Sequence, residues 1–491
     1  MLILHDTLAG DLTHIQAFAD LAEGFSLYDY VRIRQADGRE WIAQIIQPNQ
    51  NISTVGNRLD PTILHGLRLM HSHPDVQSVQ SVQVFDLLIL GEYQQGQLLT
   101  PRLRPLPGSM VFRLDARETA SVIEVPGIAE HEDGSSNVIG ELLNAAGVPL
   151  CLDGSKFHYH IMVAGGTGSG KSNVAANLID QAVKCGKCVL VHDAKPDYGL
   201  IRHENTDPRV QTAWERFADY RLFPHGAPDV RRIGFYGKCD PDLVDEVVGF
   251  RCSDFHPEML AGLFFTGSEM AEQNGFEGFV GAADALYQRA QLEQLRDYTL
   301  DLILEEVRRR NDVNGGVPLH EAIHELTARS IIRKVAGRRR AYPWLDAVGL
   351  PLRPGPSNRF RGSRLDNANS RVVRPFHLAG LVAPGRVLVI DYSQMEDQSY
   401  AVLLSYFLRE CQRFRKQTVP ADSPPRPGVV QLVDEAHRIM DNRSRHGPAL
   451  ANAFGRVMRE GRSVDHSIIL SLQNASQIPP RVMNNLNTRI V

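Results

Sequence analysis

The sequence has few cysteines, no long apolar run and no excess of positive charge. Six cysteines in 491 residues are too few for a disulfide scaffold, so we expect a reducing, cytoplasmic location. No stretch of about eighteen apolar residues occurs, so we expect no membrane-spanning helix. The first twelve residues, MLILHDTLAGDL, lack a basic start followed by a long apolar stretch, and we therefore expect no secretory signal.

The overall composition is that of an ordinary globular protein, with 43% hydrophobic and 22% charged residues. The length predicts two to four domains. Asp plus Glu is 57 and Lys plus Arg is 53, a net charge of −4. Residues 329–374 nevertheless hold twelve basic and two acidic side chains. This basic window either contacts a polyanion or is a solvated helix face and loop.

Residues 1–135 are predicted to be rich in β-structure. The segment 28–34 alternates polar and apolar residues, a turn sequence follows at 36–38, and 40–46 reads as the partner strand. Further strand candidates are 82–85 and 87–90. Short strands with frequent turns favour a small β-barrel.

From about residue 157, short apolar runs alternate with amphipathic helices, which is typical of an α/β fold with a parallel sheet. The predicted helices of residues 205–375 interrupt this pattern, one at 283–310 and one at 319–335. We therefore expect an α/β core at 136–204 and 376–491, with a helical insertion at 205–375. The predicted buried parallel strands are 160–164, 188–192, 386–390, 429–433 and 467–471.

The strongest motif is a complete phosphate-binding loop, G-x-x-x-x-G-K-[ST], placed between a predicted strand and a predicted helix. Its glycines let backbone N–H groups surround phosphates, and the helix N-terminus favours an anion. Lys171 is expected to bridge the β- and γ-phosphates, and Ser172 to bind Mg²⁺. The predicted nucleotide-binding residues are Gly165, Gly166, Thr167, Gly168, Ser169, Gly170, Lys171, Ser172 and Asn173.

Two carboxylates, Asp434 and Glu435, follow the predicted strand 429–433. Asp434 is expected to hold Mg²⁺ through water, and Glu435 to polarise the attacking water as general base. Together with Ala436 and His437 they spell the box of one helicase class. The usual companions of that box are not evident, so we regard the spelling as incidental.

Polar residues beyond the next helix complete the candidate site. Gln473 ends the last predicted strand, where it can sense a γ-phosphate. Arg459 and Arg462 lie one element earlier, where either can reach a neighbouring subunit's nucleotide as an arginine finger. The spacing does not choose between the two arginines.

In this order the motifs resemble the HerA family of hexameric DNA-translocating ATPases, within the wider HerA–FtsK group. The resemblance rests on residues 137–140, 160–172, 384–391, 433–437, 459–462 and 471–473. It implies a RecA-like P-loop NTPase core, ATP and Mg²⁺ as cofactors, and the family's small barrel at the N-terminus. It also implies a homohexamer that contacts the DNA backbone without reading sequence. After Gln473 the family continues with further strands and a C-terminal segment, whereas this sequence stops at Val491.

Two functions from different classes follow from the resemblance. The favoured one is an ATP-driven DNA translocase or helicase that works with an effector enzyme in DNA end processing or antiviral defence. The alternative is a nucleotide-binding ring scaffold that holds and activates the effector. The family's partners include a NurA-type nuclease and sirtuin-like enzymes. A zinc site is not expected, because Cys185 and Cys188 have the spacing of half a site and no second C-x-x-C exists.

Overall fold

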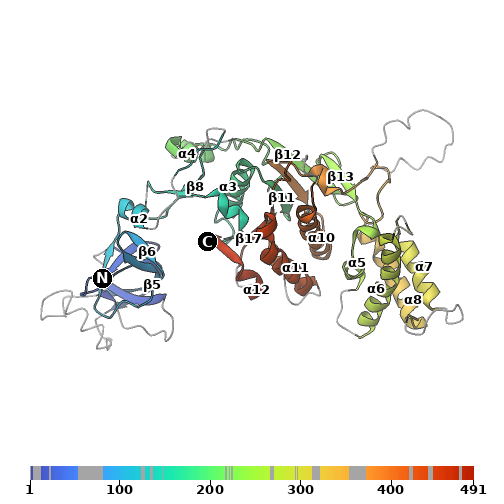
Figure 1. The fold of residues 1–491 in the computed structure, drawn as a ribbon, viewed down its shortest axis with the longest axis horizontal. Coiled ribbons are helices and arrows are strands. Elements are labelled where there is room, and N and C mark those ends of the chain that lie inside the picture. Colours follow the sequence, from blue (N-terminus) through green and yellow to red (C-terminus); the bar gives the residue numbers. More distant parts are fainter. Residues whose placement is uncertain are drawn as a thin grey trace. The chain divides into compact units, whose positions relative to one another are not determined.

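The structure is a computed structural model, and its elements are drawn in Figure 1. It describes residues 2–3, 13–20, 24–53, 81–122, 128–132, 136–145, 147–215, 218–220, 222, 225–265, 270–292, 295, 297–311, 321–352, 372–419, 424–440, 446–474 and 478–490. In this part of the chain, no helix is both long and apolar enough to cross a lipid bilayer.

The chain forms two compact units. The first comprises residues 1–152 with 219–222, and the second comprises 153–218 with 223–491. The division at residue 152 lies later than the boundary predicted at residue 135. The reason is that the small antiparallel pair β8 (Val138–Glu141) and β9 (Pro149–Cys151) groups with the first unit.

The first unit is built on a seven-stranded antiparallel sheet in the order β2-β1-β7-β3-β4-β5-β6. An additional pairing of β2 with β5 closes a ring of strands, and the predicted hairpin is confirmed as β3 paired with β4. Alternate side chains point into a shared core around Trp41, whose indole N–H donates to the Leu103 carbonyl at 3.0 Å. The strands are β1 (Leu2–Ile3), β2 (His14–Asp20), β3 (Tyr30–Arg34), β4 (Glu40–Ser53), β5 (Ser81–Gln94), β6 (Gln97–Leu99) and β7 (Met110–Arg113), and helix α2 (Ala116–Val122) follows them.

The second unit contains a nine-stranded parallel sheet in the order β14-β13-β12-β15-β11-β16-β17-β10-β18. All five predicted parallel strands are confirmed. Their apolar runs are continuous because the strands are buried on both faces of the sheet. The strands are β10 (His160–Ala164), β11 (Cys188–Asp193), β12 (Asp229–Phe235), β13 (Glu246–Gly249), β14 (Arg374–Pro375), β15 (Arg386–Asp391), β16 (Val429–Val433), β17 (His466–Leu472) and β18 (Leu486–Ile490).

Helices cover the sheet (Figure 1). Because successive side chains of a strand point to opposite faces of the sheet, the core that each side chain joins shows which helices lie on that face. Cys188 and Leu190 of β11 share a core with α10 (Asp397–Lys416) and α11 (His446–Glu460). The intervening Val189 and Val191 are equally buried and lie outside that core. Helix α3 (Lys171–Lys184) packs against the sheet through its own apolar side. Shorter helices are α4 (Pro208–Glu215), α9 (Leu378–Leu381) and α12 (Pro480–Met483).

Four helices, α5 (Pro257–Phe264), α6 (Met270–Gln291), α7 (Leu300–Asn311) and α8 (Glu325–Arg338), pack on one another. Their core is continuous with that of the sheet through an aromatic cluster that includes Phe250, Trp344 and Phe407. The prediction of a single helix at 283–310 is wrong. The chain breaks before α7, where the Leu300 amide donates to the Asp346 carboxylate at 2.8 Å.

The range predicted as a helical insertion, 205–375, contains strands as well as helices. Strands β12, β13 and β14 lie inside that range and belong to the parallel sheet. In β12 the charged residues Arg231 and Arg232 interrupt the apolar pattern, which hid the strand from sequence reading. Residues 353–371 of the basic window lie outside the described residues. After Gln473 the chain does continue with a further strand, since β18 pairs in parallel with β10.

Candidate nucleotide-binding site

The phosphate-binding loop lies between β10 and α3, as its motif requires. Gly168 (φ +81°) and Gly170 (φ +89°) have left-handed backbone conformations, which glycine adopts without a Cβ penalty. A Cβ on Gly165 would lie 2.4 Å from the Ser169 hydroxyl oxygen, so no larger residue fits there without rearrangement. Gly170 caps α3 without any side-chain hydrogen bond, and the first turn holds no acidic residue. The helix end is therefore available to an anion.

Lys171 and Ser172 are the first two residues of α3. The Lys171 ammonium donates to the Gly166 carbonyl at 2.8 Å, so the side chain folds back over the loop. Ser172 and Asn173 are exposed on the same turn. Lys171, Ser172 and Asn173 therefore lie where the oxygens of phosphates bound by the loop would be.

Carboxylates lie at the carboxyl ends of three neighbouring strands. Asp193 ends β11, Asp391 ends β15, and Asp434 directly follows β16. Burial raises the pKa of Asp434, against a hydrogen bond with Ser471 that lowers it. Burial, with repulsion from Asp434, raises the pKa of Asp193 to about 7.

Asp193 has one carboxylate oxygen engaged and one without a protein partner. Its Oδ2 accepts from the Tyr198 amide at 3.1 Å. Its Oδ1 is buried and, within the described residues, makes no hydrogen bond to protein. Such an oxygen is normally satisfied by water or an ion.

Glu435 is the most heavily bonded carboxylate of the site. Its backbone is left-handed (φ +51°), which turns the side chain away from the path of β16. Its Oε1 accepts from the Lys195 ammonium at 2.6 Å and from the Gln473 amide at 2.8 Å. His437 Nε2 lies 3.3 Å from Oε2. Burial raises the pKa of Glu435, but the Lys195 and Gln473 hydrogen bonds outweigh it and leave the pKa below its ordinary value.

The structure therefore brings Glu435 and Gln473 together but places Arg459 and Arg462 elsewhere. Both arginines are exposed and precede β17, at the amino end of the strands. The phosphate loop follows β10 at the carboxyl end of the same sheet. The seven residues of β17 span about 23 Å at 3.3 Å per residue, so neither arginine reaches the nucleotide loop of its own chain. Arg462 lies over the ring of Tyr159, 4.7 Å from its centroid.

Sequence reasoning missed Asp193 and Lys195. Both follow the apolar run of β11, and β11 pairs directly with β16, the strand that delivers Asp434 and Glu435. The available signal was the polar stretch Asp193–Asp197 at the end of a buried strand, because carboxyl ends of adjacent parallel strands form ligand sites. The sequence does not give the strand order that makes these two strands neighbours.

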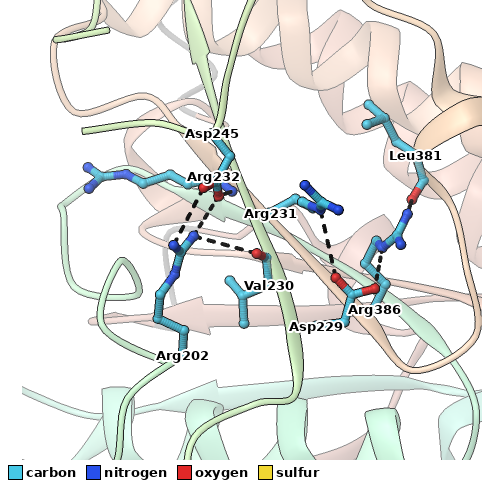
Figure 2. Close-up of polar contacts among 8 residues, drawn as sticks. All are labelled: Arg202, Asp229, Val230, Arg231, Arg232, Asp245, Leu381 and Arg386. Atoms are coloured by element: carbon cyan, nitrogen blue, oxygen red, sulfur yellow. Dashed lines mark hydrogen bonds and ion pairs between the residues drawn. The ribbon is translucent and has the colours of Figure 1, made fainter. Parts of the chain in front are cut away.

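At its far end, the segment after β11 that carries Lys195 is bound through Arg202 to Asp245 and to β12. Arg202 donates to the Asp245 carboxylate at 2.5 Å and to the Val230 carbonyl at 3.5 Å, as Figure 2 shows. The Arg232 amide donates to the same carboxylate at 2.7 Å. Its guanidinium donates to Asp391 at 2.7 Å. The end of the Lys195 segment is thereby bound to β12, an interior strand of the sheet.

The residues assigned to Mg²⁺ suit that ion. The Ser172 hydroxyl and the Asp434 carboxylate supply oxygen, the ligand atom that hard divalent ions prefer. The unpartnered Asp193 Oδ1 adds a buried acceptor beside Asp434. Over the described ranges, no three His, Cys, Asp or Glu side chains form a metal cluster. Ser172 and Asp434 would therefore hold the ion together with phosphate and water oxygens, as Mg²⁺ sites usually do.

Comparison with known proteins is consistent with this geometry. Residues 137–338 match the family described as "Helicase HerA, central domain". The chain is 24% identical over 444 residues to the DNA double-strand break repair helicase HerA of Pyrococcus furiosus, covering 82% of this chain and 67% of that protein. It is 26% identical over 197 residues to a probable helicase of Methanocaldococcus jannaschii, covering 40% of this chain and 36% of that protein.

Among solved structures, the chain aligns with the bacterial conjugative coupling protein TrwB. It aligns with a TM-score of 0.43 and 11% identity, over 77% of this chain and 74% of that chain.

Proposed function

Because the chain is a member of the HerA family of P-loop ATPases and an ATP-hydrolysing enzyme, we propose that it uses ATP hydrolysis to move along DNA as a closed ring. The observation that carries the proposal is the contact of Glu435 with Gln473. This contact joins Glu435, the general base that follows β16, to Gln473, which follows β17. Strand β17 pairs with β16 and with β10, the strand that leads into the phosphate-binding loop. A residue at the end of β17 meets a γ-phosphate held by the loop, so the state of the nucleotide reaches the base.

The roles of the chain's own groups follow from their positions. The loop 165–170 and the α3 N-terminus bind the phosphates, and Lys171 leaves the Gly166 carbonyl to neutralise them. Glu435 orients water and accepts its proton. Ser172 and Asp434 would hold Mg²⁺, which when bound neutralises charge between the β- and γ-phosphates. Ser471 donates a hydrogen bond to Asp434 and so orients its carboxylate.

The ring follows from the position of the arginines. Arg459 and Arg462 cannot reach their own phosphate loop, and an exposed arginine at that edge is suited to complete a neighbour's site. We propose that this head-to-tail contact closes into a ring of six copies. DNA would then be held through its phosphates, without sequence readout.

The alternative, a ring scaffold that activates an effector, has one specific observation in its favour. Arginines of the described part of the basic window contact the protein itself: Arg338 donates to the Phe264 carbonyl and Arg339 pairs with Asp301, both at 2.8 Å. These side chains are thereby less available to DNA. A NurA-type nuclease or a sirtuin-like enzyme, and a role in DNA end processing or antiviral defence, remain proposals, as does the cytoplasmic location.

Displacement of a third strand from a triplex on linear DNA tests the motor. The wild-type chain should displace the strand with ATP, and Glu435→Gln should bind DNA and ATP without displacing it. If wild-type chain hydrolyses ATP but never displaces the strand unless an effector enzyme is added, the scaffold function is correct instead.

A further inference from the structure

The carboxylate of Glu435 is occupied by donors from three separate segments. Lys195 and Gln473 both donate to Oε1, and His437 lies against Oε2. A carboxylate oxygen has two acceptor positions, so Oε1 has none left for water. The Glu435 side chain is only 6% exposed. A general base must accept a proton from water within hydrogen-bond reach, and in this arrangement Oε1 cannot.

Lys195 is the donor that can leave. Its side chain is 47% exposed, whereas Glu435 is buried. A lysine released from the pair enters water, which solvates ammonium strongly. The other carboxylates that act on Lys195 are Asp434 and Asp197, and neither is bonded to it. The pair is therefore held by one short contact of 2.6 Å rather than by a network.

The backbone around Lys195 is positioned by the structure on both sides. On one side, β11 pairs with β15 up to Asp193 and with β16 up to His192. On the other, Tyr198 bonds back to Asp193, and Arg202 binds Asp245 and Val230 (Figure 2). The lysine side chain can move while its Cα stays in place. Lys195 can therefore leave Glu435 and return to it, which a lysine on a flexible backbone would do less reproducibly.

We infer that Lys195 restrains the general base: in the resting site it occupies Glu435, and hydrolysis requires it to withdraw. The inference rests on the proposed function in its assignment of Glu435. The approach of a γ-phosphate gives both donors of Oε1 a competing anion, which lowers the cost of releasing the carboxylate. Loss of Lys195 should therefore free the base without DNA or a neighbouring subunit.

The test is ATP hydrolysis by the full chain without DNA, comparing wild type with Lys195→Met. Methionine keeps the length of the side chain and removes the donor. The DNA-free kcat should rise about fivefold, which corresponds to about 1 kcal/mol of barrier. The KM for ATP should stay within about twofold, because the phosphate loop is unchanged. Lys195→Arg retains a donor for the carboxylate and should return kcat toward the wild-type value.

Lys238→Met is the matched control, since Lys238 lies in the connection between β12 and β13 and is not bonded to Glu435. It should leave the DNA-free rate as in wild type. A DNA-free kcat that is unchanged or lower in Lys195→Met, in a protein with the wild-type melting temperature, overturns the inference. If Glu435→Gln abolishes hydrolysis and Lys195→Met does not raise it, the proposed function stands and the restraint fails. If Glu435→Gln hydrolyses normally, the proposed site itself is wrong.

Discussion

The guanidinium of Arg462 lies over the ring of Tyr159, at the edge of the parallel sheet opposite Glu435. Tyr159 directly precedes β10, and Arg462 lies in the turn η9 (Gly461–Val464) before β17. The same turn is anchored by Asp465, which accepts from the Lys187 ammonium at 2.6 Å. The edge of the sheet that carries Arg459 and Arg462, at the amino ends of the strands, is thus a fixed surface.

Mixing two inactive variants should restore activity if that edge completes a neighbour's site. Lys171→Ala removes the phosphate lysine, and a chain with Arg459→Ala and Arg462→Ala removes both candidate fingers. Each defect lies on a different side of the contact between subunits, so a mixture contains some complete sites. We expect about a quarter of wild-type ATP hydrolysis at equal proportions, from one complete site in four random neighbour pairs.

The ring itself should be visible by mass. Six chains of 54.7 kDa give a particle of about 330 kDa in light scattering. A strictly monomeric chain with full ATP hydrolysis would contradict the proposed sharing of sites. Single variants at Arg459 and Arg462 then decide which arginine is the finger, because only that variant should be inactive alone and regain hydrolysis when mixed with Lys171→Ala.

Lys171→Ala and Glu435→Gln should fail in different ways. Lys171→Ala loses the cation for the β- and γ-phosphates, so both hydrolysis and ATP affinity should fall, the rate by at least about 100-fold. Glu435→Gln removes the base but leaves the loop, so ATP should bind and remain unhydrolysed. Bound nucleotide after gel filtration distinguishes them. A Glu435→Gln protein with normal turnover would disprove the role of Glu435.

Weakening the attachment of the Lys195 segment at Arg202 should raise DNA-free ATP hydrolysis, as removal of Lys195 does, but by less. Arg202→Met loses the hydrogen bonds to Asp245 and to the Val230 carbonyl (Figure 2). DNA-free hydrolysis should rise by about twofold, less than in Lys195→Met, because the lysine itself remains. Arg231→Met is the control. Its side chain is exposed and lies 3.8 Å from Asp229, so hydrolysis should not change.

The basic window should contribute to DNA binding through its second half. Arg338 and Arg339 are engaged within the protein, so changing them to Gln should lower the unfolding free energy by about 1–2 kcal/mol. Neutralising Arg359, Arg361 and Arg364 should instead weaken DNA binding for all sequences alike. The slope of log affinity against log salt should become shallower by up to about three. An unchanged slope would place the DNA contact on other residues.

Acid should destabilise the fold through two buried histidines. His466 and His192 bracket Gln431 at 2.8 Å on either side, and burial lowers their pKa values to about 3 and about 4. Their ordinary pKa is about 6.5, so below that pH the unfolded chain binds protons that the folded chain does not. Stability is therefore complete above pH 6.5 and declines toward pH 4, by up to about 1.4 kcal/mol per pH unit for each histidine.

The variant His466→Gln keeps an acceptor for Gln431 and removes the titrating ring. Its melting temperature should fall less steeply than that of wild type between pH 6.5 and 4.5. His203→Gln changes an exposed histidine and should leave the slope unaltered. Equal slopes in wild type and His466→Gln would show that His466 does not titrate in this range.

The sequence predicted the elements whose signal is local. The strands at β10, β11, β15, β16 and β17 are continuous apolar runs, and the phosphate loop is a contiguous motif. Strand β12 was missed because Arg231 and Arg232 interrupt its apolar run, and the Arg232 guanidinium is paired with Asp391 of β15, a partner that only the fold brings near. The pairing of Lys195 with Glu435 was missed for a similar reason. It depends on β11 lying beside β16, and strand order is set by tertiary packing rather than by local pattern.

Strand β10 has parallel neighbours on both sides, β17 and β18. It is therefore paired on both sides up to Val163, Ala164 is paired with β17, and the Gly165 amide donates to the Leu472 carbonyl at 3.1 Å. Any ordering that phosphate binding requires is therefore confined to the short stretch from Gly166 to Gly170. At about 1–2 kcal/mol of conformational entropy for each residue fixed, a longer free segment would consume much of the affinity for ATP. The strand pair around β10 thus limits the entropic cost of nucleotide binding to five residues.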